Sequence, residues 1–316
     1  MFDIKLISGR SNLPLAQNIV NENGIKLVDV DFIDFKNKEI KVKILESMRG
    51  QDVFILQTTD PNHPHQSMME LFLLIHTAKK ASARRITAVI PYIYGSRQDR
   101  KTESRTPITI QLMGDLLKAA GVSRLITVSL HNPASVAAFG DILVDNVTTS
   151  RIFFPVLNEL IDNKEDTIVI SPDAGGVPRA KAYANAFGVD LGFSYKHRPR
   201  TNASSVLAFN ADVEGRDVFI IDDIIDTGGS LMNVIEKAKE RGARKVYVSA
   251  THGILTGEAK QMLQRSSAEK VFISDSVSHD YLPDKFEVVS LAGLLYKTIK
   301  AVHEDESVGA LFEKVI

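Results

Sequence analysis

Apolar and polar positions follow two distinct patterns along the chain. Short runs rich in β-branched residues, several of them apolar throughout, are typical of parallel strands that are covered on both faces. They occupy residues 2–8, 52–58, 85–91, 124–130, 166–172, 218–223 and 245–251. Between them, residues 65–81, 107–121, 176–188 and 230–242 carry apolar side chains at helical spacing. This alternation predicts an α/β fold in which mainly parallel sheets are flanked by helices.

One part of the chain is echoed further along. Residues 121–131 read GVSRLITVSLH and residues 242–252 read GARKVYVSATH, so that each has a helix-ending glycine, a β-rich run and a final His. The two runs are candidates for equivalent strands of two similar domains, although any helix-glycine-strand unit looks alike. A length of 316 residues also favours two domains, and a polar Thr-Thr-Ser run suggests the division 1–147 and 148–316.

Composition narrows the possible functions. With 44% hydrophobic and 24% charged residues, the chain can bury a sizeable core. A formal net charge of -1 argues against a general affinity for nucleic acid or anionic membranes. The chain has no cysteine, which excludes disulfides and thiolate chemistry. No signal-like segment or apolar run long enough to span a bilayer is present, so we expect a cytoplasmic protein.

The strongest candidate for chemistry is VFIIDDIIDTGGS, residues 218–230. We expect a strand to end at Ile221 and the Thr-Gly-Gly-Ser turn to lead into a helix, whose free N–H groups favour a phosphate. Asp222 and Asp223 lie too close to that anion to be its partners, so they should hold sugar hydroxyls or a bound cation. The alternative is that Asp226 caps the helix and that the other two aspartates are solvated.

Two further loops follow predicted strands, where ligands bind in open α/β sheets. SPDAGGVPRA places Asp173 where a carboxylate could bind Mg²⁺ directly or through water, while Arg179 and Lys181 stay unassigned. YGSRQDRKTESRTPI, residues 94–108, is dense in basic residues and suits a polyphosphate. A charged surface loop is the alternative for this segment. No Walker A sequence or dinucleotide fingerprint is present.

Two more segments complete the set of candidates. His131 ends one predicted strand and is echoed by His252, which leaves it open between a structural role and contact with metal or phosphate. SYKHRPR carries Lys196 and Arg198 beside a polar stretch typical of a mobile basic flap. Such a flap could close over the charge that develops during phosphoryl transfer.

Together these motifs resemble those of one family. VFIIDDIIDTGGS is similar to the PRPP-binding loop of type I phosphoribosyltransferases and ribose-phosphate diphosphokinases. SRQDRKTESRTPI, SPDAGGVPRA, SYKHRPR and VHEDESVGALF resemble the diphosphokinases (PRPP synthetases) specifically, and the likeness extends from KLISGRSN to residue 316. The resemblance implies two phosphoribosyltransferase-type domains and Mg²⁺-dependent diphosphoryl transfer from ATP to ribose 5-phosphate, giving PRPP and AMP. It also implies a hexamer built from dimers, with the last helix packing back on the first domain.

The resemblance also implies roles for individual residues. The catalytic flap residues would be Lys196 and Arg198. Ribose 5-phosphate would be held by Asp222, Asp223, Asp226, Thr227, Gly228, Gly229 and Ser230. ATP would contact Phe35, Asn37 and Glu39 from a neighbouring subunit, together with Arg97, Gln98, Arg100 and His131. Metal or triphosphate contacts would fall on His131 and Asp173.

The resemblance also bears on regulation and on two alternative functions. In regulated members, phosphate and ADP share an interface site, which Ser47, Arg49, Ser82, Arg105 and Ser307 match, while Gly309 stands where a second Ser is common. A non-catalytic regulatory homologue would be expected to lose loop or flap residues, and this chain keeps them. A PRPP-consuming phosphoribosyltransferase would not need the basic segment at Arg97.

Overall fold

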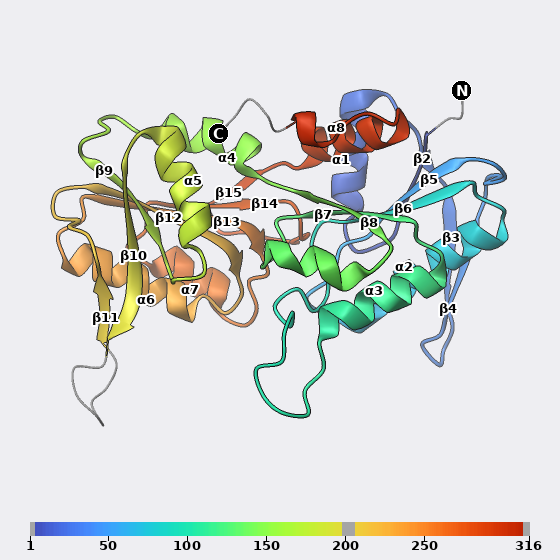
Figure 1. The fold of residues 1–316 in the computed structure, drawn as a ribbon, viewed down its shortest axis with the longest axis horizontal. Coiled ribbons are helices and arrows are strands. Elements are labelled where there is room, and N and C mark those ends of the chain that lie inside the picture. Colours follow the sequence, from blue (N-terminus) through green and yellow to red (C-terminus); the bar gives the residue numbers. More distant parts are fainter. Residues whose placement is uncertain (1–3, 198–205, 312–316) are drawn as a thin grey trace. The chain divides into compact units, whose positions relative to one another are not determined.

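The computed structural model describes residues 4–197 and 206–311, which divide into two compact units (Figure 1). The first unit contains the described residues up to Thr148 together with residues 276–278 and 290–311. The second unit contains residues 149–275 and 279–289. The last α-helix, α8 (Ala292–His303), thus belongs to the first unit, where it packs against α1 (Leu13–Asn23).

A six-stranded parallel sheet is the framework of the first unit. Its strands lie in the order β2-β1-β5-β6-β7-β8, and every neighbouring pair is parallel. Their bounds are β1 (Ile4–Ser8), β2 (Leu27–Val28), β5 (Asp52–Leu56), β6 (Arg85–Ile90), β7 (Arg124–Val128) and β8 (Leu143–Val147). The strands β3 (Val30–Asp34) and β4 (Ile40–Ile44) pair separately as an antiparallel hairpin.

Helices cover both faces of this sheet. Figure 1 shows α1 and α8 on one face and α2 (Pro64–Lys80) and α3 (Thr109–Ala120) on the other. Short 3-10 helices, η1 (Pro133–Phe139) and η2 (Gly309–Leu311), complete the unit. Because both faces are buried, β5 is apolar at four of its five positions, Val53 to Leu56, and all of them are buried.

The second unit is built in the same way. Its sheet has the order β11-β10-β9-β12-β13-β14-β15, in which β11 is antiparallel to β10 and the other pairs are parallel. The bounds are β9 (Thr167–Ser171), β10 (Asp190–His197), β11 (Val206–Phe209), β12 (Asp217–Ile225), β13 (Lys245–Gly253), β14 (Lys270–Ser274) and β15 (Phe286–Val289). Figure 1 shows α4 (Ser150–Asn158) and α5 (Val177–Phe187) on one face, and α6 (Gly229–Glu240) and α7 (Ala259–Arg265) on the other.

The central strand β12 shows why these runs are apolar at successive positions. Val218 and Ile220 join the core under α6 and α7, whereas Phe219 and Ile221 join the core under α4 and α5. Successive side chains of a strand point to opposite faces, so a strand that is covered on both sides needs apolar residues at every position. Each fully buried side chain of this kind contributes about 1.5–3 kcal/mol relative to exposure.

The sequence predicted the elements at the centre of both sheets. Each of the seven predicted strand segments and four predicted helical segments contains the expected element. The prediction was wrong at the end of β12, which continues to Ile225 rather than ending at Ile221. Pairing with β13 extends to Ile225 and Gly253, which keeps the paired aspartates inside the ladder.

The two units repeat one topology, and their two central sheets correspond strand by strand when β11 is set aside. The expected α/β fold, with two similar units that each have a mainly parallel sheet flanked by helices, is therefore confirmed. The suspected equivalence of residues 121–131 and 242–252 is wrong, however. Those runs form β7 and β13, whereas the position of β7 in the order corresponds to that of β14. A helix-glycine-strand unit recurs often enough in this fold to produce such an echo.

Candidate active site

The second unit has a crevice where the order of its strands reverses. The chain leaves β9 through α5 on one face and leaves the adjacent strand β12 through α6 on the other face. Loops after such strands diverge and leave room for a ligand beyond their carboxyl ends. The sequence SPDAGG follows β9 and the sequence DTGGS follows β12, so the topology brings two of the predicted loops to one place.

The loop after β12 turns sharply into α6. Gly228 is the N-cap residue and has φ 77°, a left-handed conformation that glycine adopts without the cost of a Cβ. Gly229 and Ser230 form the first turn of the helix, and nothing lies within 4 Å of a Cβ built on Gly229. Thr227 and Ser230 are exposed. The N-cap residue is Gly228 and not Asp226, so the alternative role weighed for Asp226 is wrong. The result is an open helix start of the kind that binds anions.

The loop after β9 is held by its own side chains. Asp173 Oδ1 accepts a hydrogen bond from Gly176 N at 2.8 Å, and Ser171 Oγ donates to the carbonyl of Asp173 at 2.7 Å. Ser194 on β10 also donates to the carbonyl of Pro172. These bonds fix the turn and keep the Asp173 carboxylate at its rim.

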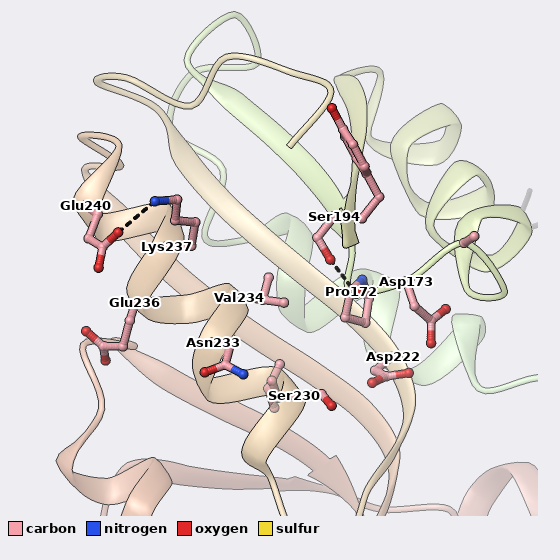
Figure 2. Close-up of a pocket in the computed structure, with 13 residues that line it drawn as sticks. Pro172, Asp173, Ser194, Asp222, Ser230, Asn233, Val234, Glu236, Lys237 and Glu240 are labelled. Atoms are coloured by element: carbon pink, nitrogen blue, oxygen red, sulfur yellow. Dashed lines mark hydrogen bonds and ion pairs between the residues drawn. The ribbon is translucent and has the colours of Figure 1, made fainter. Parts of the chain in front are cut away.

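The loop after β9, the strand β12 at Asp222 and the helix α6 from Ser230 onward line a cavity of about 750 Å³. Asp173, Asp222 and Ser230 lie at one end, and the cavity continues along α6 to Glu240, with Ser194 and Tyr195 of β10 on its wall. Figure 2 shows the carboxylates of Asp173 and Asp222 at the end that lies near the start of α6. The cavity thus joins acidic side chains to a helix start, as a phosphorylated sugar would require.

Two adjacent carboxylates repel each other beside this cavity. Asp222 and Asp223 are adjacent, and Arg179 Nη1 lies 3.2 Å from Asp223 Oδ1 and 3.8 Å from Asp222 Oδ1. Burial and then the neighbouring Asp223 carboxylate raise the pKa of Asp222 to about 7. The side chain of Asp222 keeps 20% of its exposure, so solvent and ligands can reach it. The pKa of Asp222 is raised despite the nearby Arg179, so this carboxylate suits a ligand that brings positive charge or hydroxyl donors.

Metal ligands from the protein alone are few. Among the described residues, no group of three His, Cys, Asp or Glu side chains is arranged to hold a metal ion. Asp173 and Asp222 nevertheless supply hard oxygen donors at the cavity, and Asp223 lies next to Asp222; such donors are the ligand type that Mg²⁺ prefers. Mg²⁺ is commonly bound by one or two carboxylates together with water and phosphate oxygens, so the donors present fit that ion.

The predicted flap begins on β10, the strand that forms part of the cavity wall. Lys196 is in β10 and pairs with Leu207 of β11, which places its backbone in the antiparallel hairpin that ends at the edge of the sheet. Tyr195, its neighbour, lines the cavity. Arg198 lies outside the described residues.

Residues predicted to bind ATP lie in the first unit. Arg97, Gln98 and Arg100 are exposed in the loop between β6 and α3, and Gln98 Oε1 accepts a hydrogen bond from Thr109 Oγ1 at 2.6 Å. His131 is exposed after β7. The turn of the β3–β4 hairpin carries the residues Phe35, Asn37 and Glu39. Glu39 N donates to Asn37 Oδ1 at 3.1 Å, which shapes this turn.

Residues matched to an effector site also lie in the first unit. Ser47 and Arg49 precede β5, and Gly50 N donates to the carbonyl of Ser82 at 2.9 Å, which brings these two segments together. Ser82 and Arg105 have φ of 64° and 65°, which is uncommon for residues with a Cβ. Ser307 Oγ accepts from Ala310 N at 3.3 Å near the end of the described chain.

Two residues of the second unit acquire a role only from the fold. Arg179, left unassigned by the sequence, contacts the aspartate pair from α5. Thr256, which no sequence motif singled out, donates from Oγ1 to Asp226 Oδ1 at 2.6 Å. Arg179 could have been suspected from its place one turn into a helix behind a strand-end loop. Thr256 carried no comparable signal.

Comparison with known proteins gives concordant results. Residues 4–121 match the N-terminal domain of ribose phosphate pyrophosphokinase, and residues 193–313 match the phosphoribosyl synthetase-associated domain. The ribose-phosphate pyrophosphokinase of Thermosipho africanus is 42% identical over 99% of this chain and 98% of its own length. That of Chlorobaculum tepidum is 40% identical over 98% of this chain and 95% of its own length.

A solved structure agrees with the sequence relatives. The phosphoribosylpyrophosphate synthetase from Mycobacterium smegmatis superposes with a TM-score of 0.90 and 35% sequence identity, covering 96% of this chain and 99% of that protein. Within residues 4–197 and 206–311, each helix is too short or too polar to cross a membrane.

Proposed function

The chain belongs to the ribose-phosphate pyrophosphokinase family, and we propose from this premise that it makes PRPP and AMP from ATP and ribose 5-phosphate. The anomeric hydroxyl oxygen forms a bond to the β-phosphorus of ATP, the bond from that phosphorus to the α,β-bridging oxygen breaks, and the hydroxyl proton is released. AMP leaves with the bridging oxygen. The observation that carries this proposal is the cavity where the Asp222 carboxylate meets the open start of α6.

Ribose 5-phosphate would occupy the loop after β12. The start of α6 and the residues Thr227 to Ser230 suit the 5-phosphate, because backbone N–H groups and hydroxyls are good partners for an anion. Asp222 and Asp223 suit the ribose hydroxyls, or a cation bound to them, because an ionised carboxylate can only accept hydrogen bonds. Asp226 lies between Asp223 and Thr227 in the sequence and would contact the sugar phosphate.

ATP and the charge of the reaction would be handled by other segments. Arg97, Gln98, Arg100 and His131 would contact the nucleotide, and Phe35, Asn37 and Glu39 would reach the adenine of a neighbouring subunit. Lys196 and Arg198 would stabilise the charge that develops on the transferred group. Phosphoryl transfer depends mainly on such positioning and charge stabilisation, because little covalent chemistry is left to the protein.

Mg²⁺ is the metal proposed for the reaction. When bound, it would neutralise phosphate oxygens and align the diphosphoryl group. Asp173 and the pair Asp222 and Asp223 would hold it in the second unit, together with phosphate oxygens and water. His131, in the first unit, is the other side chain matched to a metal contact.

The remaining expectations concern organisation and control. Residues 1–147 would carry the ATP and oligomer contacts, and residues 148–316 the sugar-phosphate loop. We propose a cytoplasmic hexamer built from dimers. Phosphate and ADP would act as effectors through Ser47, Arg49, Ser82, Arg105 and Ser307. The relatives are named for pyrophosphokinase activity and so favour neither a PRPP-consuming transferase nor a non-catalytic homologue.

A product assay tests the reaction directly. The purified protein is incubated with ATP, Mg²⁺ and ribose 5-phosphate, and nucleotide products are separated by chromatography. Release of AMP that requires ribose 5-phosphate supports the proposal, whereas ADP as product, or no turnover, contradicts it. Repeating the assay with added phosphate or ADP tests the effector proposal, and omitting Mg²⁺ tests the metal.

A further inference from the structure

The turn that follows β13 is fastened to the start of the sugar-phosphate loop. The β12–β13 ladder ends with Ile225 opposite Gly253. Beyond it, the N–H groups of Ile254 and Leu255 donate to the carbonyl of Ile225 at 2.8 and 3.0 Å, and Thr256 N donates to the carbonyl of Asp226 at 3.1 Å. The turn therefore follows the backbone of the loop past the end of the sheet.

This turn depends on an uncommon backbone conformation. Leu255 has φ 54°, which costs a residue with a Cβ about 1–2 kcal/mol. Its side chain is 5% exposed and joins the core that lies under α6 and α7. Burial of a leucine is worth about 1.5–3 kcal/mol, which is enough to offset that cost. The left-handed residue reverses the chain, so that Thr256 turns back to Asp226 instead of following the strand direction.

The contact that results is short and involves a substrate-loop carboxylate. Thr256 Oγ1 donates to Asp226 Oδ1 at 2.6 Å. A hydroxyl donating to a carboxylate makes a charge-assisted bond, which is stronger than one between neutral groups. Thr256 is half-buried, so part of this bond is shielded from water. Together with the backbone bond between the same two residues, it ties Thr256 to Asp226 at both the main chain and the side chain.

We propose that Thr256 is a positioning residue for the sugar-phosphate site, because its hydroxyl holds the Asp226 carboxylate in the orientation that receives ribose 5-phosphate. This inference rests on the function proposed for the loop. Fixing a side chain before the ligand arrives removes the entropic cost of ordering it during binding. Thr256 does not itself touch the sugar phosphate and acts through Asp226.

Two substitutions separate the hydroxyl from the shape of the side chain. Thr256→Val keeps the branched shape and removes the donor, while Thr256→Ser keeps the donor and removes a methyl group. We expect Thr256→Val to raise the KM for ribose 5-phosphate about tenfold, as the loss of a hydrogen bond to a charged group should. The KM for ATP should stay the same, and Thr256→Ser should lie close to the parent.

The experiment combines steady-state kinetics with calorimetric binding of ribose 5-phosphate. Unchanged binding and KM in Thr256→Val, or equal losses in the Val and Ser variants, would overturn the inference. So would a lowered melting temperature in Thr256→Val with unchanged kinetics, because the bond would then serve stability alone. If the Val variant does not fold, Thr256→Ala is compared with Thr256→Ser in the same way. A parent protein that binds ribose 5-phosphate but releases no AMP contradicts the proposed function. The role of Thr256 is then decided by comparing the binding of ribose 5-phosphate to the parent and the variants.

Discussion

The two units share a strand order but differ at the crevice where that order reverses. In the first unit the corresponding position lies between β1 and β5, where a network of polar side chains forms around the buried Glu70. Glu70, 3% exposed, accepts from Arg10 N and Nε, both at 2.7 Å, and from Gln57 Nε2 at 3.0 Å. A Cβ on Gly9 would lie only 2.2 Å from Gln57 Oε1, so the glycine allows this close packing.

In the second unit the corresponding crevice is open. Asp222 lines a cavity, and Asp222 and Asp223 share one guanidinium, that of Arg179. The β10–β11 hairpin borders this unit's sheet, whereas the corresponding edge of the first sheet is the two-residue strand β2. The same position of the fold therefore carries a hydrogen-bonded network around a buried Glu70 in the first unit, and a carboxylate that lines a cavity in the second. Perturbed carboxylates in a cavity are typical of functional sites, whereas fully hydrogen-bonded networks stabilise a core.

The largest expected effect concerns the β10–β11 hairpin at the edge of the second sheet. Lys196→Ala should lower kcat by about 10³-fold and change the KM for ribose 5-phosphate little, because a flap cation acts mainly in the transition state. Steady-state kinetics of PRPP formation measure this split. Lys181→Ala, at an exposed position of α5, is the matched control and should behave as the parent. Equal kcat values for the Lys196 variant and the parent would show that Lys196 has no part in the mechanism.

The next effect tests whether the filled crevice serves stability. Glu70→Gln should lower the free energy of unfolding by about 2 kcal/mol, because it leaves Arg10 and the buried Gln57 with a neutral acceptor at a buried position. Urea denaturation of the two proteins gives the difference. Asp141→Asn breaks an exposed ion pair with Lys118 and should cause no resolvable change. A Glu70 variant as stable as the parent would show that the network is not a source of stability.

A third effect, comparable in size, tests whether repulsion between carboxylates destabilises the open crevice. The pKa of Asp222 is raised to about 7 in the folded protein, above its ordinary value of 3.8, so the folded state binds more protons than the unfolded state between these limits. Without substrates and with Mg²⁺ chelated, the free energy of unfolding should therefore fall as the pH rises from about 4 to about 7. We expect a fall of about 1–3 kcal/mol from this group.

Asp222→Asn is the variant that isolates this pH dependence. The difference in unfolding free energy between variant and parent should increase across the same pH range and level off above pH 7, as measured by urea denaturation at each pH. Added Mg²⁺ should lessen the fall in the parent, since a bound cation favours the ionised carboxylate. If the difference in unfolding free energy is constant with pH, the pKa of Asp222 is not raised in the folded protein, and repulsion in the crevice does not lower stability.

Local patterns in the sequence determined a large part of this protein. Strands such as β12 and helices such as α6 follow from apolar periodicity, and the turn at Gly228 follows from glycine chemistry, because all of these act over a few residues. The α/β class and the loops after β9 and β12 could therefore be predicted. Edge elements with mixed patterns, such as β2 and β15, could not, because their pairing and not their composition makes them strands.

The tertiary structure alone decided how those loops work together. Strand order showed that β7 and β13 are not equivalent, although their sequences resemble each other. Asp222 acquired its raised pKa from burial beside Asp223, which no spacing in the sequence measures. Arg179 reaches Asp223 across 44 positions, and Thr256 reaches Asp226 across 30 positions and through the left-handed turn at Leu255. Such contacts depend on how distant segments pack, so they become visible only when the chain is folded.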